Sequence, residues 1–376
     1  MTEISAFSEN GPERMKGYLE KIATGPRMSK DLTEEEAEDA LTLVLNNEVS
    51  PVRAGVFLIA ARMKLETVPE NLGYWKAMHK ITHKHSVPFE KLLQVADPFD
   101  GFNRSPYFGF YTLPVMAAMG LPAYGHSTLG LPPKFGITFE NLLIEHYRFS
   151  EADGPEKRLD LLKEFRFGFL STRQTHPALE NLRGMRIEII KRTMLSTLEK
   201  MLMPVEAKAG GNFLATSYFH KGYEHSMMAV ANISPFDRTI IGNGMEGTTL
   251  YGVHKPAEVF IHNGNNPPEE KHLTLENMFD RQTSDKISGS FKELKKERAE
   301  LASLAQWGEA ALKNNKGPAG TLTACQAATL CHLFGMFSSP QKGFNTARDL
   351  LQNGTCYESL MRYIEKGRGP ATRTGK

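Results

Sequence analysis

Two segments between Asp97 and Gly136 carry the residue types that binding of a charged small molecule requires. The first reads D-P-F-D-G-F-N-R-S from Asp97 to Ser105, and the second reads G-H-S-T-L-G-L-P-P-K-F-G from Gly125 to Gly136. Carboxylates accept hydrogen bonds and bind cations, whereas guanidinium and ammonium groups bind phosphates and carboxylates. An apolar stretch separates the two segments, so the pattern predicts two loops around a buried element. Together the loops predict a pocket for a charged ligand.

The overall charge argues against a general attraction to nucleic acid. The chain of 376 residues contains 45 Lys and Arg against 43 Asp and Glu, a formal net charge of +2. With so little net charge there is no global field to draw in a polyanion. Any basic surface must therefore be local.

Cysteine usage and hydropathy indicate the cellular context. Cys325, Cys331 and Cys356 are odd in number and lack CxxC spacing, which indicates neither a disulfide framework nor a zinc ribbon. We therefore expect a reducing, cytoplasmic compartment. The N-terminus is polar and acidic, unlike a signal peptide, and the sequence has no run of about 18 apolar residues. We expect no membrane span.

The first 85 residues carry three clear helix starts. Thr33 followed by Glu36, and Thr67 followed by Glu70, match the capping box, in which each side chain pairs with the other residue's backbone N–H. Ser50 precedes a proline at the first helical position, where proline is favoured. Apolar residues then recur at helical spacing. We expect a small helical domain whose apolar faces pack on one another or on a partner subunit.

Beyond this segment the pattern changes to short apolar runs between glycine-containing turns. Residues 113–119, 238–241 and 258–261 are candidate strands or buried helix cores. Helical patterns lie between them, at 183–202 and 346–351. Strands that alternate with helices predict an α/β domain with a mainly parallel sheet, in which ligands bind at the carboxyl ends of strands.

Three segments, in order along the chain, resemble one known family. Residues 46–70 (NNEVSPVRAGVFLIAARMKLETVPE) resemble the helical N-terminal domain of anthranilate phosphoribosyltransferases and pyrimidine nucleoside phosphorylases. HPAL at 176–179, RGMR at 183–186 and RTML at 192–195 are similar to that family's His-Pro-Ala, arginine and Arg-Thr segment. Residues 343–354 (GFNTARDLLQNG) are similar to its C-terminal helix. The resemblance extends over nearly the whole chain.

The resemblance implies the fold of glycosyltransferase family 3, with a small helical N-terminal domain beside a larger α/β domain. The implied helical domain comprises residues 1–87, with residues 176–204 packing onto it. The implied α/β domain comprises residues 88–175 and 205–376. The resemblance also implies a homodimer formed through the helical domains, with the active site in the cleft between the two domains.

The implied chemistry is transfer of a phosphoribosyl group from phosphoribosyl pyrophosphate to an aromatic amine. Pyrophosphate leaves from a ribosyl cation-like state, so such an enzyme mainly positions groups and neutralises charge. In the family, magnesium held by carboxylates bridges the pyrophosphate.

The first loop departs from the family pattern D-x-x-G-T-G-G-D followed by N-x-S-T. Of the glycines only Gly101 remains, and Phe99 and Phe102 stand where glycines would expose N–H groups. Arg104 could partly compensate as a phosphate donor. The residues of this loop that the resemblance implies for phosphate or ribose are Asp97, Asp100, Gly101, Asn103, Arg104 and Ser105.

The second loop lacks the lysine and arginine of the family's Lys-His-Gly-Asn-Arg pattern. His126 holds the place of the histidine and Lys134 matches a later basic residue before a glycine, so the resemblance implies both as phosphate ligands. The family's magnesium-binding acidic pair falls at 242–251, where Glu246 is the acidic residue. The implied metal ligands are Asp100 and Glu246.

The resemblance further implies that His176, Arg183 and Arg186 contact the aromatic acceptor. His176 precedes a proline and could instead cap the helix that follows. Arg192, in the Arg-Thr pair, is expected to tie the helical segment to the α/β domain.

The residue types leave alternatives open in both loops. Asp97 and Asp100 could share a magnesium ion or bind a ribose hydroxyl, but aspartates beside proline and glycine also cap turns. Arg104 and His126 could together hold a phosphate or a carboxylate, or each could be a loop residue with a backbone partner.

The leading hypothesis is an anthranilate phosphoribosyltransferase-like glycosyltransferase that binds a phosphorylated ribose compound in the interdomain cleft. The residues lost from the two loops argue against the standard anthranilate activity. The alternative is a non-catalytic paralogue that uses the same dimeric scaffold to bind nucleic acid or a protein. The basic, glycine-rich segment 365–376 is a further candidate for weak nucleic-acid contact.

Overall fold

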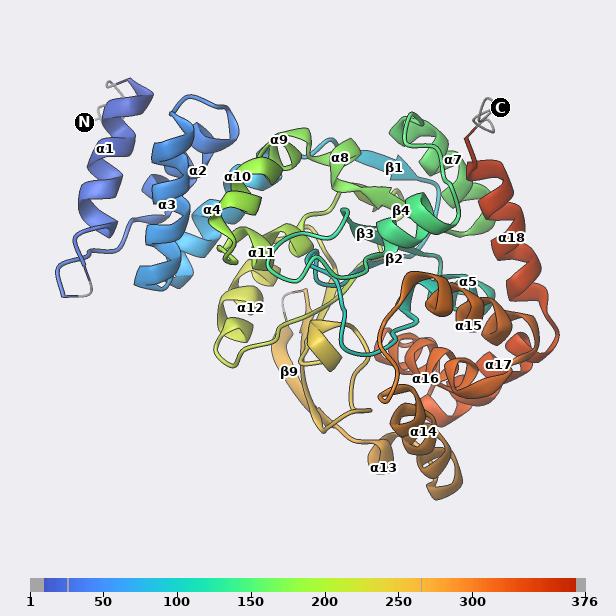
Figure 1. Ribbon diagram of the computed structural model, residues 1–376. Helices are drawn as coiled ribbons and strands as arrows, with labels where there is room; N and C mark the ends of the chain where they lie inside the picture. Colours follow the sequence, from blue (N-terminus) through green and yellow to red (C-terminus); the bar gives the residue numbers. More distant parts are fainter. Residues whose placement is uncertain (1–9, 26, 265, 370–376) are drawn as a thin grey trace.

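The computed structural model describes residues 10–25, 27–264 and 266–369 (Figure 1). Residues 1–9, part of the segment that we expected not to be a signal peptide, lie outside the described residues. The same holds for residues 370–376, the end of the basic C-terminal segment. In the part of the chain that is described, no helix is long and apolar enough to cross a membrane.

Four helices form the described N-terminal segment, at the blue end of the chain in Figure 1. They are α1 (Gly11–Ile22), α2 (Glu34–Leu45), α3 (Pro51–Lys64) and α4 (Val68–Lys80). Both predicted capping boxes are present: Thr33 pairs reciprocally with Glu36 before α2, as Thr67 does with Glu70 before α4. Such caps satisfy backbone N–H groups that the first helical turn leaves unpaired, which is why these helices begin where the sequence predicts.

Short helices from the middle of the chain return to this segment. They are α8 (Thr172–Thr175), α9 (Pro177–Asn181), α10 (Arg183–Ile189), α11 (Leu195–Leu198) and the 3-10 turn η2 (Glu199–Met201). Leu195 and Leu198 are fully buried in one hydrophobic cluster with Phe57 of α3. The helical pattern over 183–202 is interrupted at Ile190, whose φ of 66° is left-handed. Because of this interruption, residues 191–193 leave the helical path and line a cleft.

A seven-stranded sheet forms the centre of the described α/β part, in the order β4-β3-β2-β6-β7-β8-β9. Its strands are β2 (Leu92–Ala96), β3 (Ala123–Ser127), β4 (Phe167–Ser171), β6 (Asn212–Ser217), β7 (Arg238–Gly242), β8 (Ala257–Asn263) and β9 (Asn266–Leu273). Neighbours from β4 to β7 are parallel, and β8 and β9 extend the sheet antiparallel. A separate parallel pair consists of β1 (His85–Val87) and β5 (Val205–Ala207). The predicted mainly parallel sheet is confirmed.

The fold settles the segments that the sequence left open as strands or buried helices. Residues 238–241 and 258–261 lie in β7 and β8, so both are strands. Residues 113–119 instead fall largely in α5 (Gly109–Ala118), a helix that is buried along most of its length. A helix without a solvent face shows little helical periodicity, so its sequence resembles that of a buried strand.

Helices pack on both faces of the sheet. The remaining elements are α6 (Phe139–Asn141), the π-helix η1 (Leu142–His146), α7 (Pro155–Phe165), α12 (Tyr223–Ile233), the 3-10 turn η3 (Met245–Gly247), α13 (Leu275–Met278), α14 (Arg281–Leu294), α15 (Leu301–Asn314), α16 (Gly317–Leu333), α17 (Pro340–Gln352) and α18 (Thr355–Gly367). Helices α15 to α18 lie at the opposite end of the molecule from α1 to α4 (Figure 1). Leu214 of β6 and Ile241 of β7 join the hydrophobic cluster of the N-terminal helices. The helical segment is therefore fixed against the sheet.

Candidate functional site

A cleft of about 930 Å³ lies between the helical segment and the carboxyl ends of the parallel strands. One wall comes from α3, through Arg62 and Met63. The opposite wall comes from the loops that follow β2, β3, β6 and β7. These strands are parallel, so their carboxyl ends share one edge, which is where open α/β sheets bind ligands.

Asp100 stands in the wall of the cleft between two cationic side chains. Its Oδ2 accepts a hydrogen bond of 2.9 Å from Arg192 Nε and a second one from Arg192 Nη2. Its Oδ1 lies 3.4 Å from Lys134 Nζ. The Asp100 side chain is only 6% exposed, so these cations replace most of the charge compensation that water would give. Burial lowers the pKa of the Lys134 ammonium, and the Asp100 charge opposes that shift.

The end of the first loop, at Arg104, is hydrogen-bonded to Glu246, which follows β7. Glu246 has a left-handed φ of 52°, and its Oε2 accepts a 3.1 Å hydrogen bond from the Arg104 backbone N–H. The Arg104 side chain is 74% exposed, with its Nε 3.9 Å from Glu246 Oε1. Asn103 Nδ2 donates to the Lys134 carbonyl oxygen at 3.5 Å. The loop backbone is therefore held, while the Arg104 guanidinium can turn toward a ligand.

The cleft carries a surplus of positive charge although the whole chain is nearly neutral. Among the described residues that line it, five side chains are arginine or lysine and two are carboxylates. The cations are Arg62, Arg104, Lys134, Lys191 and Arg192, and the carboxylates are Asp100 and Glu246. A local excess of cations favours anions, and arginine in particular favours phosphate and carboxylate groups.

Aromatic side chains complete the walls of the cleft. Phe99 and Phe219 line it, and Phe219 is 54% exposed. The Arg62 guanidinium lies 5.7 Å from the ring centre of Tyr223. An exposed ring beside clustered cations suits a ligand that has both a flat or apolar part and an anionic part.

A buried lysine lies close to the cleft. Lys200 is 5% exposed and its Nζ donates to the carbonyl oxygen of Ser217 at the end of β6. Burial lowers the pKa of its ammonium to about 8, and the charges of Asp100 and Glu199 oppose this shift. Lys200 therefore adds positive potential beside Asp100 without lining the cleft.

Asp97, a predicted ligand, belongs to a buried network behind the first loop. Its Oδ2 accepts from Tyr107 Oη at 2.8 Å and its Oδ1 accepts from the Thr249 N–H at 2.8 Å. Gln326 Nε2 in turn donates to Tyr107 Oη at 2.6 Å and to Thr249 Oγ1 at 2.9 Å. Burial raises the pKa of Asp97 to about 6, against these hydrogen bonds. The network joins the first loop to the loop after β7. Ser105, also predicted, is buried as well.

Gly101 brings the two predicted loops into direct contact. Its φ is +74°, and a Cβ atom there would lie 2.4 Å from the backbone of Gly136. Gly101 and Gly136 therefore serve the packing of one loop on the other. That contact holds Asp100 and Lys134 near each other.

His126 and His176 form a buried pair rather than part of the cleft wall. His126 Nε2 lies 3.2 Å from Thr175 Oγ1, which lies 2.8 Å from His176 Nδ1. His176 Nε2 lies 2.8 Å from Thr82 Oγ1. Burial lowers the pKa of His126 to about 3 and that of His176 well below its ordinary value. Both imidazoles are neutral at pH 7, and the structure does not bring His126 together with Arg104.

The two predicted acceptor arginines are held in ion pairs. Arg186 is buried and donates to both oxygens of Glu199, at 2.6 and 2.9 Å. Arg183 pairs with Glu180 and donates to Thr128 Oγ1 at 2.6 Å. Neither side chain lines the cleft. Their contact with an acceptor stays a prediction.

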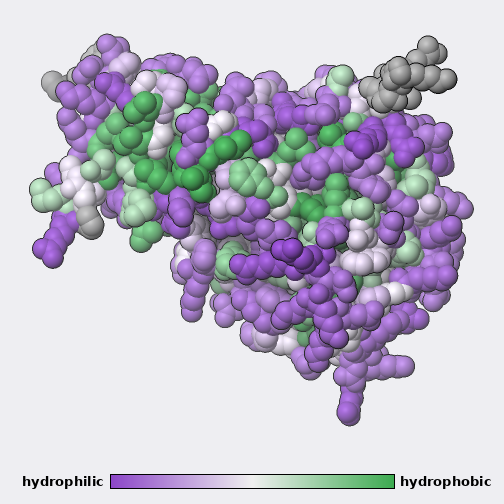
Figure 2. All heavy atoms as spheres, viewed as in Figure 1, coloured by the Kyte–Doolittle hydropathy of each residue, from purple (hydrophilic) through white to green (hydrophobic). Residues whose placement is uncertain are grey.

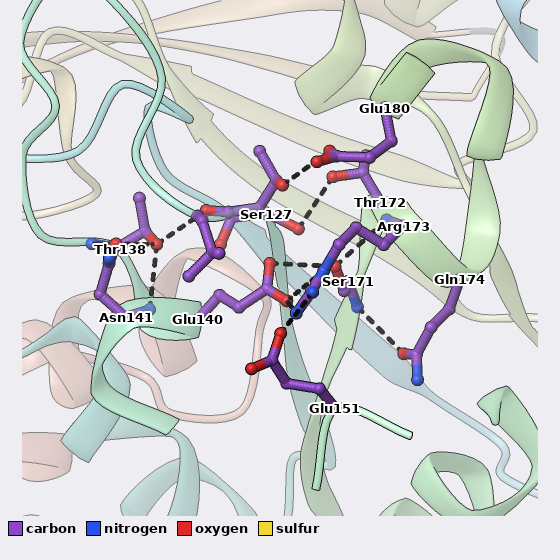
Figure 3. Close-up of polar contacts among 12 residues, drawn as sticks. Ser127, Thr138, Glu140, Asn141, Glu151, Ser171, Thr172, Arg173, Gln174 and Glu180 are labelled. Atoms are coloured by element: carbon purple, nitrogen blue, oxygen red, sulfur yellow. Dashed lines mark hydrogen bonds and ion pairs between the residues drawn. The ribbon is translucent and has the colours of Figure 1, made fainter. Parts of the chain in front are cut away.

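Polar contacts fix the second loop from the side of β4, as Figure 3 shows. Thr138 Oγ1 donates to the Thr128 carbonyl oxygen at 2.7 Å, which closes the loop on itself. Next to it, Ser171 Oγ donates to Glu140 at 2.9 Å, and Arg173 pairs with the same carboxylate. The Glu140 side chain is only 2% exposed, so this ion pair is part of the interior. The two ends of the loop that carries Lys134 are therefore joined.

The two predicted metal ligands, Asp100 and Glu246, both line the cleft, and their part in a magnesium site stays a prediction. Mg²⁺ prefers six oxygen ligands and is commonly held by one or two free carboxylates plus phosphates and water. Both oxygens of Asp100 face cations, whereas Glu246 accepts from the Arg104 N–H through Oε2 only and its buried Oε1 has no hydrogen-bond partner. Among the described residues, no group of three or more His, Cys, Asp or Glu could hold a metal ion.

The structure adds cleft residues that the sequence did not point to. Lys191, Arg62 and Phe219 line the cleft. Arg192 ties the helical segment to the first loop through its ion pair with Asp100, as expected, and in addition lines the cleft. Lys191 did have a signal in the sequence, because two adjacent cations, Lys191 and Arg192, directly follow an amphipathic helix pattern. Arg62 gave no signal, because its role depends on how α3 packs against the sheet.

Comparison with known proteins bears on the family and the fold. Residues 16–80 match a family described as "Glycosyl transferase family, helical bundle domain". The anthranilate phosphoribosyltransferase of Methanopyrus kandleri is 24% identical over 352 residues, which cover 92% of this chain and 98% of the relative.

Solved structures share the fold. The crystal structure of anthranilate phosphoribosyltransferase from Thermus thermophilus matches with a TM-score of 0.69 and 24% identity, over 95% of this chain and 99% of that one. The enzyme from Saccharomyces cerevisiae in complex with PRPP and Mg matches with a TM-score of 0.72 and 17% identity, over 95% and 99% of the two chains. These comparisons support an anthranilate phosphoribosyltransferase-like member of glycosyltransferase family 3.

Proposed function

We propose that the chain is a cytoplasmic phosphoribosyltransferase-like protein whose cleft binds a phosphorylated ribose compound, with glycosyl transfer as its chemistry. The observation that carries the proposal is the excess of cations at the carboxyl edge of the sheet, five against two among the described lining residues. The similar yeast enzyme was solved in complex with phosphoribosyl pyrophosphate and magnesium, and both chains are covered almost completely.

In this proposal the cations of the cleft receive the phosphates. Arg192 and Lys134 stand together on either side of Asp100, and Arg104 can turn in from the first loop. When pyrophosphate leaves ribose, negative charge grows on its oxygens. Once these cations hold the phosphates, they stabilise this charge without further rearrangement. The chain's own part is then to orient the ligand and to neutralise that charge.

Transfer to anthranilate is not the reaction that we propose. Phe99 lines the cleft in the loop where the family has glycines, and the loop glycines Gly101 and Gly136 are used for packing. The residues implied for an aromatic acceptor, such as His176 and Arg186, are occupied in the interior. We propose that the acceptor is a different molecule, held beside the exposed ring of Phe219.

Calorimetry with phosphoribosyl pyrophosphate and magnesium tests the proposal. We expect saturable heat for the wild-type chain, and much weaker binding for Arg192→Ala. A matched control is Arg281→Ala on α14, because Arg281 is 96% exposed and does not line the cleft. If titration of the wild type with millimolar ligand gave no heat, the proposal would be wrong.

A gel-shift series with single-stranded DNA and RNA separates this function from the alternative, a nucleic-acid-binding paralogue. Binding that weakens steeply with salt, together with no heat from phosphoribosyl pyrophosphate, would favour the alternative. No feature of the cleft favours a polynucleotide over a small phosphate compound.

We also propose a homodimer formed through the helical segment. Figure 2 shows hydrophobic residues gathered over the N-terminal helices. The exposed apolar side chains there include Val52, at 75%, and Val56, at 43%, both on α3. Ile187 of α10 is 44% exposed and Ile190, directly after α10, is 59% exposed. Sedimentation equilibrium is expected to give a dimer for the wild type and a monomer for Val52→Asp; a wild-type monomer at all concentrations would contradict this.

A further inference from the structure

We propose that the cleft binds phosphate groups through Arg192 and Lys134 without magnesium. Before the ligand binds, the Asp100 carboxylate is the internal anion that pairs with these two cations, which then turn toward the phosphate. This inference rests on the proposed function, because it names how the same cleft holds its ligand. It differs from the requirement for a metal that the family resemblance implies.

The first support is the position of Asp100. Its two oxygens lie between a guanidinium and an ammonium, at 2.9 Å from Arg192 Nε and 3.4 Å from Lys134 Nζ. An arginine and a lysine around one oxygen anion form the arrangement that proteins use for phosphate. The Asp100 carboxylate therefore occupies the position of an anionic ligand and keeps the two cations oriented.

The second support is that Arg192 can leave Asp100 at small cost. The Arg192 side chain is 40% exposed and comes from the irregular segment after Ile190, whereas the Asp100 side chain is 6% exposed. When Arg192 turns to a phosphate, Lys134 stays beside Asp100, and the buried Lys200 ammonium also interacts with its charge. The Asp100 carboxylate is then not left as an uncompensated buried charge, which would be costly.

The third support is the charge that a metal ion would meet. A divalent cation entering the cleft approaches five cationic side chains and two carboxylates among the described lining residues. Like charges repel, and the repulsion is stronger near a protein surface than in bulk water. To bind Asp100, the ion would have to displace both Arg192 and Lys134. The protein's own cations already supply the charge that magnesium would bring.

Calorimetry on the full chain with inorganic pyrophosphate tests the inference, once in EDTA and once in magnesium chloride. We expect saturable binding in EDTA, with a Kd within about threefold of the value in magnesium. Binding of pyrophosphate only in magnesium would overturn the inference while the proposed function stands. Phosphoribosyl pyrophosphate is titrated in parallel, and the absence of heat from both ligands under both conditions would overturn both proposals.

Asp100→Asn separates an internal anion from a metal ligand, because it keeps the shape of the side chain and removes its charge. We expect Asp100→Asn to bind pyrophosphate in EDTA about three- to tenfold more tightly, since the competing anion is gone. If Asp100 were a magnesium ligand, the variant would instead bind more weakly in magnesium. That result would contradict the inference.

Two further variants keep the test independent of the folding of Asp100→Asn. Arg192→Ala is expected to weaken binding in EDTA by about tenfold or more, and Arg281→Ala is expected to leave it unchanged. Melting curves recorded for each variant check that the protein is folded. Equal affinities of Arg192→Ala and Arg281→Ala in EDTA would show that Arg192 does not hold the phosphate.

Discussion

The loops after the parallel strands contain two sets of polar residues, one in the cleft and one behind it. The two sets differ in how exposed their hydrogen-bond and ion-pair partners are. In the cleft, the cationic partners of Asp100 are partly exposed, and Arg192 can turn toward a ligand. Behind the loops, Asp97 and His126 are buried with partners that are themselves buried. Asp97 and Asp100 are only three residues apart. In our proposal, the exposure of a polar residue's partner, rather than the residue's own type, separates a binding residue from a structural one.

Removing the Asp97 carboxylate should have the largest effect, and the effect should fall on stability. In Asp97→Ala the buried Thr249 N–H loses its acceptor and Tyr107 loses one partner. An unpaired buried group costs about 1–3 kcal/mol, so we expect the free energy of unfolding in urea to fall by about 2–4 kcal/mol. Asp160→Ala is the control, because Asp160 is 74% exposed beside Lys163. Equal losses in the two variants would remove the contrast between interior and surface.

Gly101→Ala should have the next largest effect, because it separates the two loops that hold the cleft together. The new Cβ would meet the Gly136 backbone at 2.4 Å, at a φ of +74°. We expect a loss of about 2–3 kcal/mol in the free energy of unfolding, together with weaker ligand binding. Gly17→Ala is the matched control: Gly17 lies within α1 with nothing within 4 Å of the new Cβ. A stable Gly101→Ala variant with unchanged binding would show that the loop contact does not position the cleft.

The pH dependence of stability should distinguish the two buried groups, because their pKa values shift in opposite directions. Burial raises the pKa of Asp97 from 3.8 to about 6, so its contribution to stability is present below pH 4 and is lost as the pH rises through 6. Burial lowers the pKa of His126 from 6.5 to about 3, so its contribution is present above pH 6.5 and is lost as the pH falls.

Urea unfolding between pH 4 and 7 measures both slopes against variants. The difference in free energy of unfolding between the wild type and Asp97→Asn should decrease as the pH rises. The same difference between the wild type and His126→Gln should decrease as the pH falls. Each pKa unit corresponds to about 1.4 kcal/mol. Parallel pH profiles for the wild type and both variants would show that neither group is buried as described.

Arg192→Ala should have the smallest effect on stability, although it is expected to impair ligand binding. Its side chain is 40% exposed, and partly exposed ion pairs contribute about 0–1 kcal/mol. We expect the free energy of unfolding in urea to change by less than about 1 kcal/mol. A loss as large as that of Asp97→Ala would place Arg192 among the structural residues and weaken the comparison.

Local signals in the sequence were sufficient for the N-terminal helices. Thr33 with Glu36 and Thr67 with Glu70 form capping boxes in the structure because a cap is made by residues three apart. Residues 113–119 were left open between strand and helix, because α5 is buried and lacks a polar face. The break at Ile190 was not foreseen, since the apolar spacing continues across it.

The candidate site could be located from sequence only in outline. The segments around Asp97 and Lys134 were recognised as paired loops, and the loops do meet, at Gly101 and Gly136. Which side chains of those loops face the cleft was not predictable, because a residue of a loop has no fixed periodicity. Asp100 faces the cleft, while Asp97 and His126 turn inward.

The sequence by itself determined the helical segment, the mainly parallel sheet and the family, because these depend on short-range spacing and on collinear motifs. Only the tertiary structure decided that Arg192, from a broken helix, and Lys134, from the second loop, meet on the two sides of Asp100. The three residues are brought together by the packing of the helical segment on the sheet. Because they come from segments far apart in the sequence, their ion pairs exist only once that packing is complete.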